Sequence, residues 1–304
     1  TQSPTPTTTP TPKKVVSIPG LGGSWNTVAL LSCSIGNSPD NWIITPNFGT
    51  TVYEPLYNDL QQAGYQPYYF AYDWRKNIPD SNQQLTSFLN SIAPGNEKVS
   101  LVGHSMGGLV GKSYLQTISE TSNKLNKLLM VGSPHNGAVG AYPVWSAGEI
   151  WTDDIRIRIA MTFVIESCGK LHGKTNRDVV RTLMPSFGNL LPRFTYLINA
   201  KSNIFTTPVD AQNTLPLTPI TNPYLGTILG TISGYGFNTP SSFTVKDPSM
   251  GDLKYPVWLD GKPVQVTTTT EGDNTVLKNS ETLSGVPDVS LRLDHSGLIN
   301  SLEG

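Results

Sequence analysis

The chain has 304 residues, enough for one large α/β domain or for two smaller domains. Its formal net charge is −1, and charged residues make up 14 % of it, against about 25 % in an average soluble domain. No basic stripe is present, which argues against a nucleic acid as partner, and no apolar run approaches the ~20 residues of a membrane span. These totals indicate a globular protein with neither a nucleic-acid surface nor a transmembrane segment.

The first twelve residues are only Thr, Pro, Gln and Ser. Such a segment stays extended and solvated, so we expect a linker over residues 1–12 and a folded domain over residues 13–304. Thr-Pro spacers commonly tether domains of exported proteins, which favours a secreted or cell-surface protein over a cytosolic enzyme with a disordered N-terminus. Cys33 and Cys168 can pair in an exported protein, but two cysteines do not establish pairing, and they lack the clustering of a zinc site.

Strands and helices are predicted to alternate over the first part of the chain. We expect strands near residues 15–18, 66–72, 98–102 and 127–131, and helices near residues 52–63, 82–93 and 106–118. This alternation indicates βαβ units and a mostly parallel sheet, and therefore an α/β fold. The triplet Asp73-Trp74-Arg75, which follows the second strand, is interpreted as an Arg–Asp pair that braces a loop under a tryptophan.

The motif Gly103-His104-Ser105-Met106-Gly107 lies between a predicted strand and a predicted helix. This context is typical of a nucleophile elbow, in which Ser105 would be the nucleophile; the alternative is a glycine-rich loop that only packs. Gly103 and Gly107 are expected because a Cβ at either position would collide with a neighbouring element. We expect two amides to hold an oxyanion: that of Met106, at the start of the helix, and that of Leu21, in the glycine-rich loop after the first strand.

The alternation ends near residue 138. We expect residues 138–225 to form an inserted cap or lid; the alternative is a structural excursion packed on the main core. Within it, isoleucines alternate with arginines over residues 155–159, so a short strand competes there with a helix. Strands are predicted again near residues 227–236, 264–270 and 289–293, and a short helix begins near Leu298.

A nucleophilic serine requires a general base, and the base is held in place by an acid. In α/β-hydrolases these residues follow the order Ser, Asp or Glu, His along the chain. We expect His295 to be the base, because it follows the last predicted strand. Of the other histidines, His104 is interpreted as structural, His135 as shaping the pocket floor or bracing a loop, and His172 as exposed.

We expect Asp273 to be the acid. It stands 22 residues before His295, in a Gly-Asp-Asn-Thr-Val turn that can present its carboxylate at the C-terminal edge of the sheet. Among the alternatives, Asp260 is typical of a hairpin turn, Asp294 is adjacent to the histidine, and Asp210 falls inside the insertion. The pattern implies no metal and no cofactor.

Together, several motifs resemble the lecithin:cholesterol acyltransferase / lysosomal phospholipase A2 family. They are Pro-Gly-Leu-Gly-Gly, Tyr-Asp-Trp-Arg, Gly-His-Ser-Met-Gly-Gly, Gly-Ser-Pro-His-Asn-Gly, Gly-Asp-Asn-Thr-Val and the late histidine. Tyr-Asp-Trp-Arg, at residues 72–75, is the motif most specific to that family. The resemblance runs from Val15 to the C-terminus, and it implies an α/β-hydrolase fold, a cap, a triad of Ser105, Asp273 and His295, and acyl-ester chemistry.

The expected function is therefore that of a serine carboxylic ester hydrolase of lipase or esterase type, phospholipase A included. One alternative is a lipid acyltransferase on the same scaffold, and a less favoured one is a non-catalytic surface binding module. The expected partner is an ester or lipid substrate at a lipid–water interface, and the expected state is a monomer.

Overall fold

The structure is a computed structural model that describes residues 12–35, 41–47, 49–119, 122–152, 155–216, 228–254 and 256–300. The predicted linker over residues 1–12 falls almost entirely outside the described residues, as does the end of the predicted insertion beyond residue 216.

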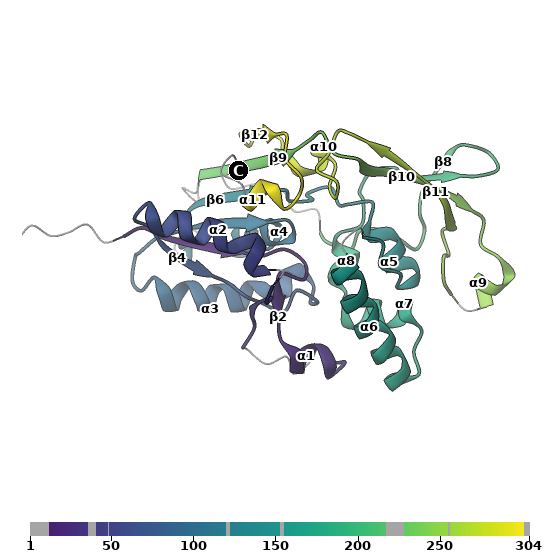
Figure 1. The fold of residues 1–304 in the computed structure, drawn as a ribbon, viewed down its shortest axis with the longest axis horizontal. Helices are drawn as coiled ribbons and strands as arrows, with labels where there is room; N and C mark the ends of the chain where they lie inside the picture. The colour runs from purple at the N-terminus through teal and green to yellow at the C-terminus, as the bar shows by residue number, and fades with distance from the viewer. Residues whose placement is uncertain are drawn as a thin grey trace, which may run out of the picture.

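A six-stranded sheet forms the centre of the molecule (Figure 1). Its strand order is β12-β9-β6-β5-β1-β4, and every neighbouring pair is parallel. The strands are β1 (Lys14–Ile18), β4 (Gln66–Tyr69), β5 (Val99–His104), β6 (Leu125–Val131), β9 (Ile228–Gly234) and β12 (Asp288–Leu291). The parallel α/β architecture predicted from the alternation is thereby confirmed.

Successive side chains of β5 and β6 point to opposite faces of the sheet, and each face is covered by helices. Leu101 and Leu128 belong to a large apolar cluster with residues of α3 and α4, whereas Val102 and Leu129 pack in a smaller cluster with α2 and α11. These helices are α2 (Gly49–Gln62), α3 (Asn82–Ile92), α4 (Met106–Thr117) and α11 (Gly297–Asn300), and the 3-10 helix η1 (Ile78–Ser81) precedes α3.

A short excursion follows β1. It contains β2 (Ser24–Trp25), which pairs with β3 (Ile43–Ile44), and α1 (Thr27–Leu31). The side chain of Asn26 caps α1 by accepting the Ala29 amide at 2.9 Å. Its helix is only five residues long.

The insertion is helical at its start. It contains α5 (Ala141–Ala147), α6 (Ile155–His172), α7 (Asn176–Leu183) and α8 (Ser186–Asn189). Residues 155–159, where a strand competed with a helix in the sequence, begin α6. The rest of that segment decides the outcome, because its buried residues recur at helical spacing, at Met161, Val164, Ile165 and Cys168.

A second sheet is built from two separate parts of the chain. Its order is β11-β10-β7-β8, with β7 (Leu197–Asn199) and β8 (Phe205–Thr206) from the insertion. The other two strands, β10 (Thr239–Lys246) and β11 (Lys262–Thr269), follow β9 and are joined by a connection that contains α9 (Met250–Lys254). Asp260 therefore lies in a turn before β11 and not at the tip of a hairpin. Its carboxylate accepts the amides of residues 209–211 and ties the two parts together.

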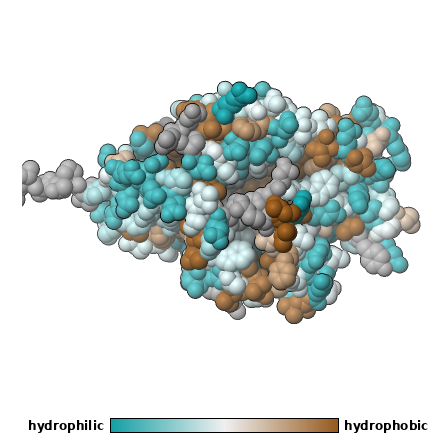
Figure 2. Space-filling view, viewed as in Figure 1, coloured by the Kyte–Doolittle hydropathy of each residue, from teal (hydrophilic) through white to brown (hydrophobic). Residues whose placement is uncertain are grey.

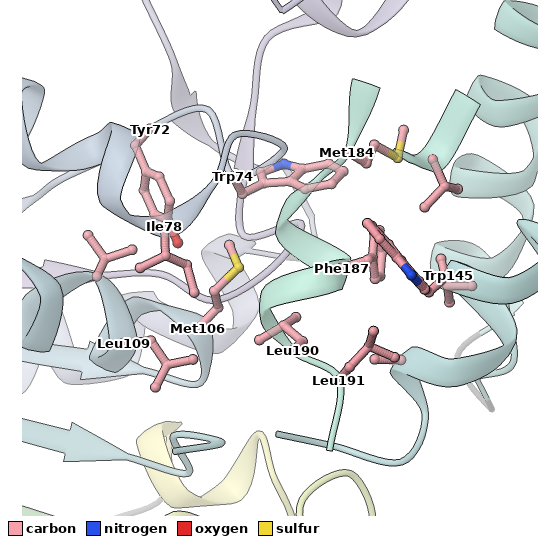
Figure 3. Close-up of a cluster of buried hydrophobic side chains, with 14 of the residues drawn as sticks. Tyr72, Trp74, Ile78, Met106, Leu109, Trp145, Met184, Phe187, Leu190 and Leu191 are labelled. Carbon is pink, nitrogen blue, oxygen red and sulfur yellow. The ribbon is translucent and has the colours of Figure 1, made fainter. Parts of the chain in front are cut away.

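The insertion and the main sheet share one apolar core. Figure 3 shows Tyr72, Trp74 and Met106 from the sheet side facing Phe187 and Leu190 from the insertion, all of them buried. The first part of the insertion is therefore packed against the core of the main sheet.

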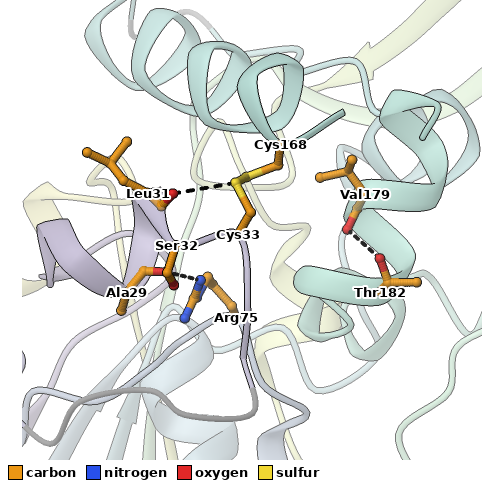
Figure 4. Close-up of a disulfide and its surroundings, with 8 residues drawn as sticks. All are labelled: Ala29, Leu31, Ser32, Cys33, Arg75, Cys168, Val179 and Thr182. Carbon is orange, nitrogen blue, oxygen red and sulfur yellow. Dashed lines mark hydrogen bonds between the residues drawn. A yellow bond between two sulfur atoms is a disulfide. The ribbon is translucent and has the colours of Figure 1, made fainter. Parts of the chain in front are cut away.

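A disulfide between Cys33 and Cys168 also joins the excursion after β1 to α6 (Figure 4). Close to it, Arg75 donates two hydrogen bonds to Asp73, both at 2.8 Å, and one to the carbonyl of Ala29 at 2.7 Å. Both members of the Asp73–Arg75 pair are buried, so the predicted loop brace is confirmed. Arg75 of the ion pair and the disulfide thus both hold the segment around α1, the first at Ala29 and the second at Cys33.

Candidate active site

Ser105 stands between β5 and α4 in a backbone conformation that only a tight turn imposes. Its φ is 54° and its ψ is −125°, a left-handed region that few residues other than glycine adopt. A Cβ on Gly103 would lie 2.5 Å from the Cα of Gly108, and one on Gly107 would lie 2.1 Å from the carbonyl oxygen of Ile18. Both predicted collisions are therefore present, one with the following helix and one with β1.

The glycine-rich loop after β1 lies against this turn. A Cβ on Gly20 would stand 2.8 Å from the Cβ of Ser105, so only a bare backbone fits there. Leu21 follows Gly20 in this loop, and Met106 opens α4. In the described part of the chain neither of these two amides donates a hydrogen bond to another protein group.

The side chains of Asp273 and His295 are hydrogen-bonded to each other. His295 Nδ1 and Asp273 Oδ2 are 2.5 Å apart, and the amide of His295 donates to the carbonyl of Asp273 at 2.8 Å. Asp273 Oδ1 accepts the amides of Thr275 and Val276 at 2.9 and 2.7 Å. In the turn predicted around Asp273, one carboxylate oxygen thus accepts two backbone amides, and the other oxygen accepts the imidazole N–H.

The Asp273 carboxyl group is buried and remains ionised. Burial by itself would raise its pKa, but the attraction of His295 and hydrogen bonds from His295, Glu281 and Val276 outweigh that effect and hold the pKa at about 2. An ionised acceptor at Oδ2 requires a proton on His295 Nδ1, so in the neutral ring Nε2 is the nitrogen that can accept a proton.

The imidazole of His295 and the turn at Ser105 meet at the C-terminal end of β6. The amide of Ser105 donates to the carbonyl of Val131 at 2.7 Å, and a Cβ on the next residue, Gly132, would lie 3.2 Å from the His295 ring. Among the residues that the structure describes, the Ser105 hydroxyl makes no hydrogen bond to that ring. Such bonds are often long in unliganded enzymes and tighten when substrate binds.

A chain of hydrogen bonds connects the glycine-rich loop with the loop that carries His295. The amide of Gly20 donates to the Tyr53 hydroxyl at 2.8 Å, and that hydroxyl donates to His104 Nδ1 at 2.9 Å. His104 Nε2 donates to the carbonyl of His295 at 2.8 Å, since a carbonyl can only accept. Burial, followed by the charge of His295, lowers the pKa of His104 to about 3 and keeps its ring neutral. His104 therefore has a bracing role, as expected.

The remaining histidines lie away from this group. His135 is buried, and its amide donates to the carbonyl of Ser280 at 2.8 Å. Burial, followed by the charge of Lys112, lowers the pKa of the His135 ring to about 3. His172 is exposed at the end of α6, as expected.

The other candidate acids are engaged elsewhere. Asp210 forms ion pairs with Arg177 and Arg181, and Asp294 accepts the amide of Gly297 at 2.7 Å at the start of α11. Asp260 binds the amides described above. Among the candidates considered from the sequence, the structure brings only Asp273 onto the ring of His295.

Glu281, at the end of α10 (Lys278–Glu281), was not anticipated from the sequence. Its side chain is fully buried, and its Oε2 accepts the amide of Gly234 at 2.6 Å. One atom each from Asp273, Glu281 and His295 lies within 4.8 Å of the others, a spacing that also suits a metal ion. Here Asp273 Oδ2 is hydrogen-bonded to His295 Nδ1, and Glu281 Oε2 to a backbone amide. No local pattern distinguishes this glutamate from a solvated one.

Comparison with known proteins gives a family and a set of structural neighbours. The model of the family described as Lecithin:cholesterol acyltransferase matches residues 41–192, half of the chain. No curated protein matches the sequence.

The neighbours are distant. The mature lipase BlEst2 of Bacillus licheniformis is 16 % identical, over 99 % of this chain and 92 % of that one, with a TM-score of 0.47. A metagenomic carboxyl esterase is 13 % identical over 98 % and 76 %, with a TM-score of 0.45. The carboxylesterase CesB of Bacillus subtilis is 9 % identical over 96 % and 80 %, with a TM-score of 0.41. The parallel sheet, the elbow after β5 and the family match together identify an α/β-hydrolase fold, as predicted.

Proposed function

Because the chain belongs to the lecithin:cholesterol acyltransferase family, we propose that it is a serine carboxylic ester hydrolase of lipase or esterase type. The observation that carries this proposal is the strained backbone of Ser105, set at the same sheet edge as the bonded pair His295–Asp273. A strained turn of this kind is maintained only where the surrounding structure enforces it, and it commonly marks a functional serine.

In the proposed first step, Ser105 Oγ attacks the ester carbonyl carbon while His295 Nε2 takes the hydroxyl proton. Asp273 holds the ring through Nδ1 and stabilises its positive charge. The carbonyl oxygen becomes an anion that the amides of Leu21 and Met106 bind, at the positive end of α4. One such donor contributes about 3–4 kcal/mol to the stability of the transition state.

The tetrahedral intermediate then collapses. The bond to the alcohol oxygen breaks, and His295 Nε2 returns its proton to that oxygen, which leaves an acyl ester on Ser105. Water, deprotonated by the same nitrogen, attacks the acyl carbon and releases a carboxylic acid. No step requires a metal ion or a cofactor.

Transfer of the acyl group to a second alcohol is the other candidate activity, and the family name favours it. It would use the same acyl-enzyme, with a lipid alcohol in the place of water. Product analysis with and without an added long-chain alcohol distinguishes the two: hydrolysis gives free acid only, whereas transfer gives a new ester.

We also propose that residues 138–225 act as a cap over the site and that the protein is exported. The position of α5–α8 against the elbow supports the cap, and the Cys33–Cys168 disulfide supports an oxidising compartment. Among the described helices, none has both the length and the apolarity needed to cross a bilayer.

Exposed apolar side chains support a substrate at a lipid–water interface. Figure 2 shows apolar side chains on the lower part of the molecule, where Figure 1 has α1 and α6. Val28 and Leu31 on α1, and Ile159 and Phe163 on α6, are each more than half exposed. Grouped exposed apolar residues are typical of surfaces that contact lipid or protein.

The test is an ester and phospholipid panel of graded acyl length, run with the wild type and with Ser105→Ala. We expect the variant to lose more than a thousandfold in kcat, and a fluorophosphonate probe to label the wild type but not the variant. The matched control is Ser91→Ala, since Ser91 is an exposed serine at the end of α3. Native rates in the Ser105→Ala variant would overturn the proposal, and an unlabelled, inactive wild type would favour a binding module.

A further inference from the structure

Glu281 is a buried carboxyl group that the proposed reaction does not use. Its side chain has no exposed surface, and its Oε2 accepts the amide of Gly234, the last residue of β9. Gly234 is itself in close contact with the acid, since a Cβ placed on it would lie 2.5 Å from the Cβ of Asp273. Glu281 and Asp273 therefore both lie against Gly234, at the end of β9.

The carboxyl groups of Glu281 and Asp273 are neighbours, with an oxygen of each within 4.8 Å of the other. Two ionised carboxylates can only accept, so a bond between them requires a proton on one of the two. Asp273 faces His295 and two backbone amides, all of which favour its ionised form. The proton therefore belongs on Glu281.

The two oxygens of Glu281 have different surroundings. Oε2 accepts an amide, whereas Oε1 is buried and has no donor partner among the described residues. A proton on Oε1 converts this orphaned acceptor into the donor that the bond to Asp273 needs. Burial first, and then repulsion by Asp273, raise the pKa of Glu281 to about 11, which agrees with this placement.

The ionisable groups that face Glu281 come from several elements. Asp273 lies on the turn before α10, His295 on the loop before α11, and Asp288 on β12. Lys278, on α10 itself, lies over the ring of Tyr235, and β9 has no ionisable residue. His295 is already hydrogen-bonded to Asp273, and the amide of Gly234, which favours the ionised form of Glu281, is outweighed by burial and by the nearby carboxylates.

We propose that Glu281 is a positioning residue that keeps its proton and donates a hydrogen bond to Asp273, so that the acid is aligned on His295 and its charge is moderated. This inference rests on the proposed function. The donated bond fixes the plane of the Asp273 carboxylate, as the backbone amides do on its other side. By dispersing the negative charge, it also limits how strongly Asp273 stabilises the protonated ring.

Two variants separate this role from mere packing. In Glu281→Gln the amide can accept from Gly234 through oxygen and donate to Asp273 through nitrogen, as the neutral acid does. In Glu281→Leu the volume is roughly kept, but both polar functions are lost. We expect kcat/KM of the Gln variant to stay within about twofold of wild type, and that of the Leu variant to fall about five- to tenfold, the range of one lost hydrogen bond.

The pH profile of kcat/KM is the readout that packing alone would not change. Loss of the donor in Glu281→Leu concentrates charge on Asp273, which then holds the protonated imidazole more tightly, so the acid limb moves to higher pH. In Glu281→Gln the acid limb stays in place. A shift of that limb to lower pH in the Gln variant would mean that an anion had been removed, and it would overturn the proposal. An unshifted Leu variant would overturn it equally.

A second measurement does not depend on activity. Infrared difference spectra of wild type against Glu281→Gln at pH 7 should show the carbonyl stretch of a protonated carboxylic acid in the wild type alone. Absence of that band refutes the protonated state, even if the Leu variant fails to fold. An enzyme inactive on every ester, but with the band present, would refute the proposed function while leaving the proton on Glu281 established.

Discussion

The pH dependence of stability provides a strict test of the buried acid pair. The perturbation is Glu281→Gln, which removes a titrating proton but keeps one donor and one acceptor. Burial and the charge of Asp273 raise the pKa of Glu281 from 4.5 to about 11 in the folded protein. The unfolded chain therefore loses this proton near pH 4.5, while the folded protein retains it.

The sign and size of the effect follow from linkage. Below pH 4.5 both states carry the proton, and the stability associated with Glu281 is fully present. Above that pH, unfolding releases one proton, so the free energy of unfolding falls by about 1.4 kcal/mol per pH unit until the folded group itself ionises. Gln does not titrate. Between pH 5.5 and 8.0, the variant should therefore gain about 3 kcal/mol relative to the wild type.

The pH dependence of stability that other groups contribute cancels in this comparison. Asp273, whose pKa is lowered, and His104 and His135, whose pKa values are lowered by burial, contribute their own pH dependence to both proteins alike. Urea unfolding followed by tryptophan fluorescence at several pH values, with the disulfide intact, measures the difference.

Glu281→Leu is the matched control for this experiment. It also lacks the Glu281 proton, so its curve should likewise lack the fall with pH that Glu281 causes in the wild type, and it should lie at lower stability because of the lost hydrogen bonds. A difference between wild type and Glu281→Gln that stays constant from pH 5.5 to 8.0 would show that the folded protein ionises Glu281, and the reasoning would fail.

Three further predictions concern the scaffold around the site. Cys33→Ser opens a loop of 135 residues and should lower the free energy of unfolding by about 2–5 kcal/mol; in urea unfolding, equal stability with and without the bond would contradict this. Arg75→Leu leaves Asp73 buried without its partner and should cost about 3–5 kcal/mol by the same assay, whereas a loss below 1 kcal/mol would mean that the pair is dispensable. Tyr53→Phe breaks the link from the glycine-rich loop to His104 and should lower kcat more than it raises KM, by about tenfold; unchanged ester kinetics would rule out a positioning effect.

Much of the candidate site could be predicted because its signals are local. The elbow is encoded by a strand, a glycine-spaced serine and a helix, and the structure contains each of the predicted close contacts at Gly103 and Gly107. The turn around Asp273 is likewise local, since two of its own amides bind the carboxylate. The parallel sheet followed from the rhythm of apolar segments along the chain.

Glu281 and the second sheet could not be predicted in this way. The burial of Glu281 depends on β9 and on the Asp273 turn, and β7 pairs with a strand that lies more than 40 residues further along the chain. The sequence also left residues 155–159 undecided between a strand and a helix. In the structure they begin α6, because five alternating residues are too few to outweigh the longer helical pattern that follows.

The sequence by itself determined the order of the elements, the serine turn, and the positions of Asp273 after β11 and of His295 after β12. These features could be predicted because periodicity and turn chemistry act between near neighbours. Only the tertiary structure decided which cysteines pair, which strands share the second sheet and which carboxyl group must keep a proton. Those outcomes depend on burial and on charges brought together from distant segments, and a solvated chain contains neither.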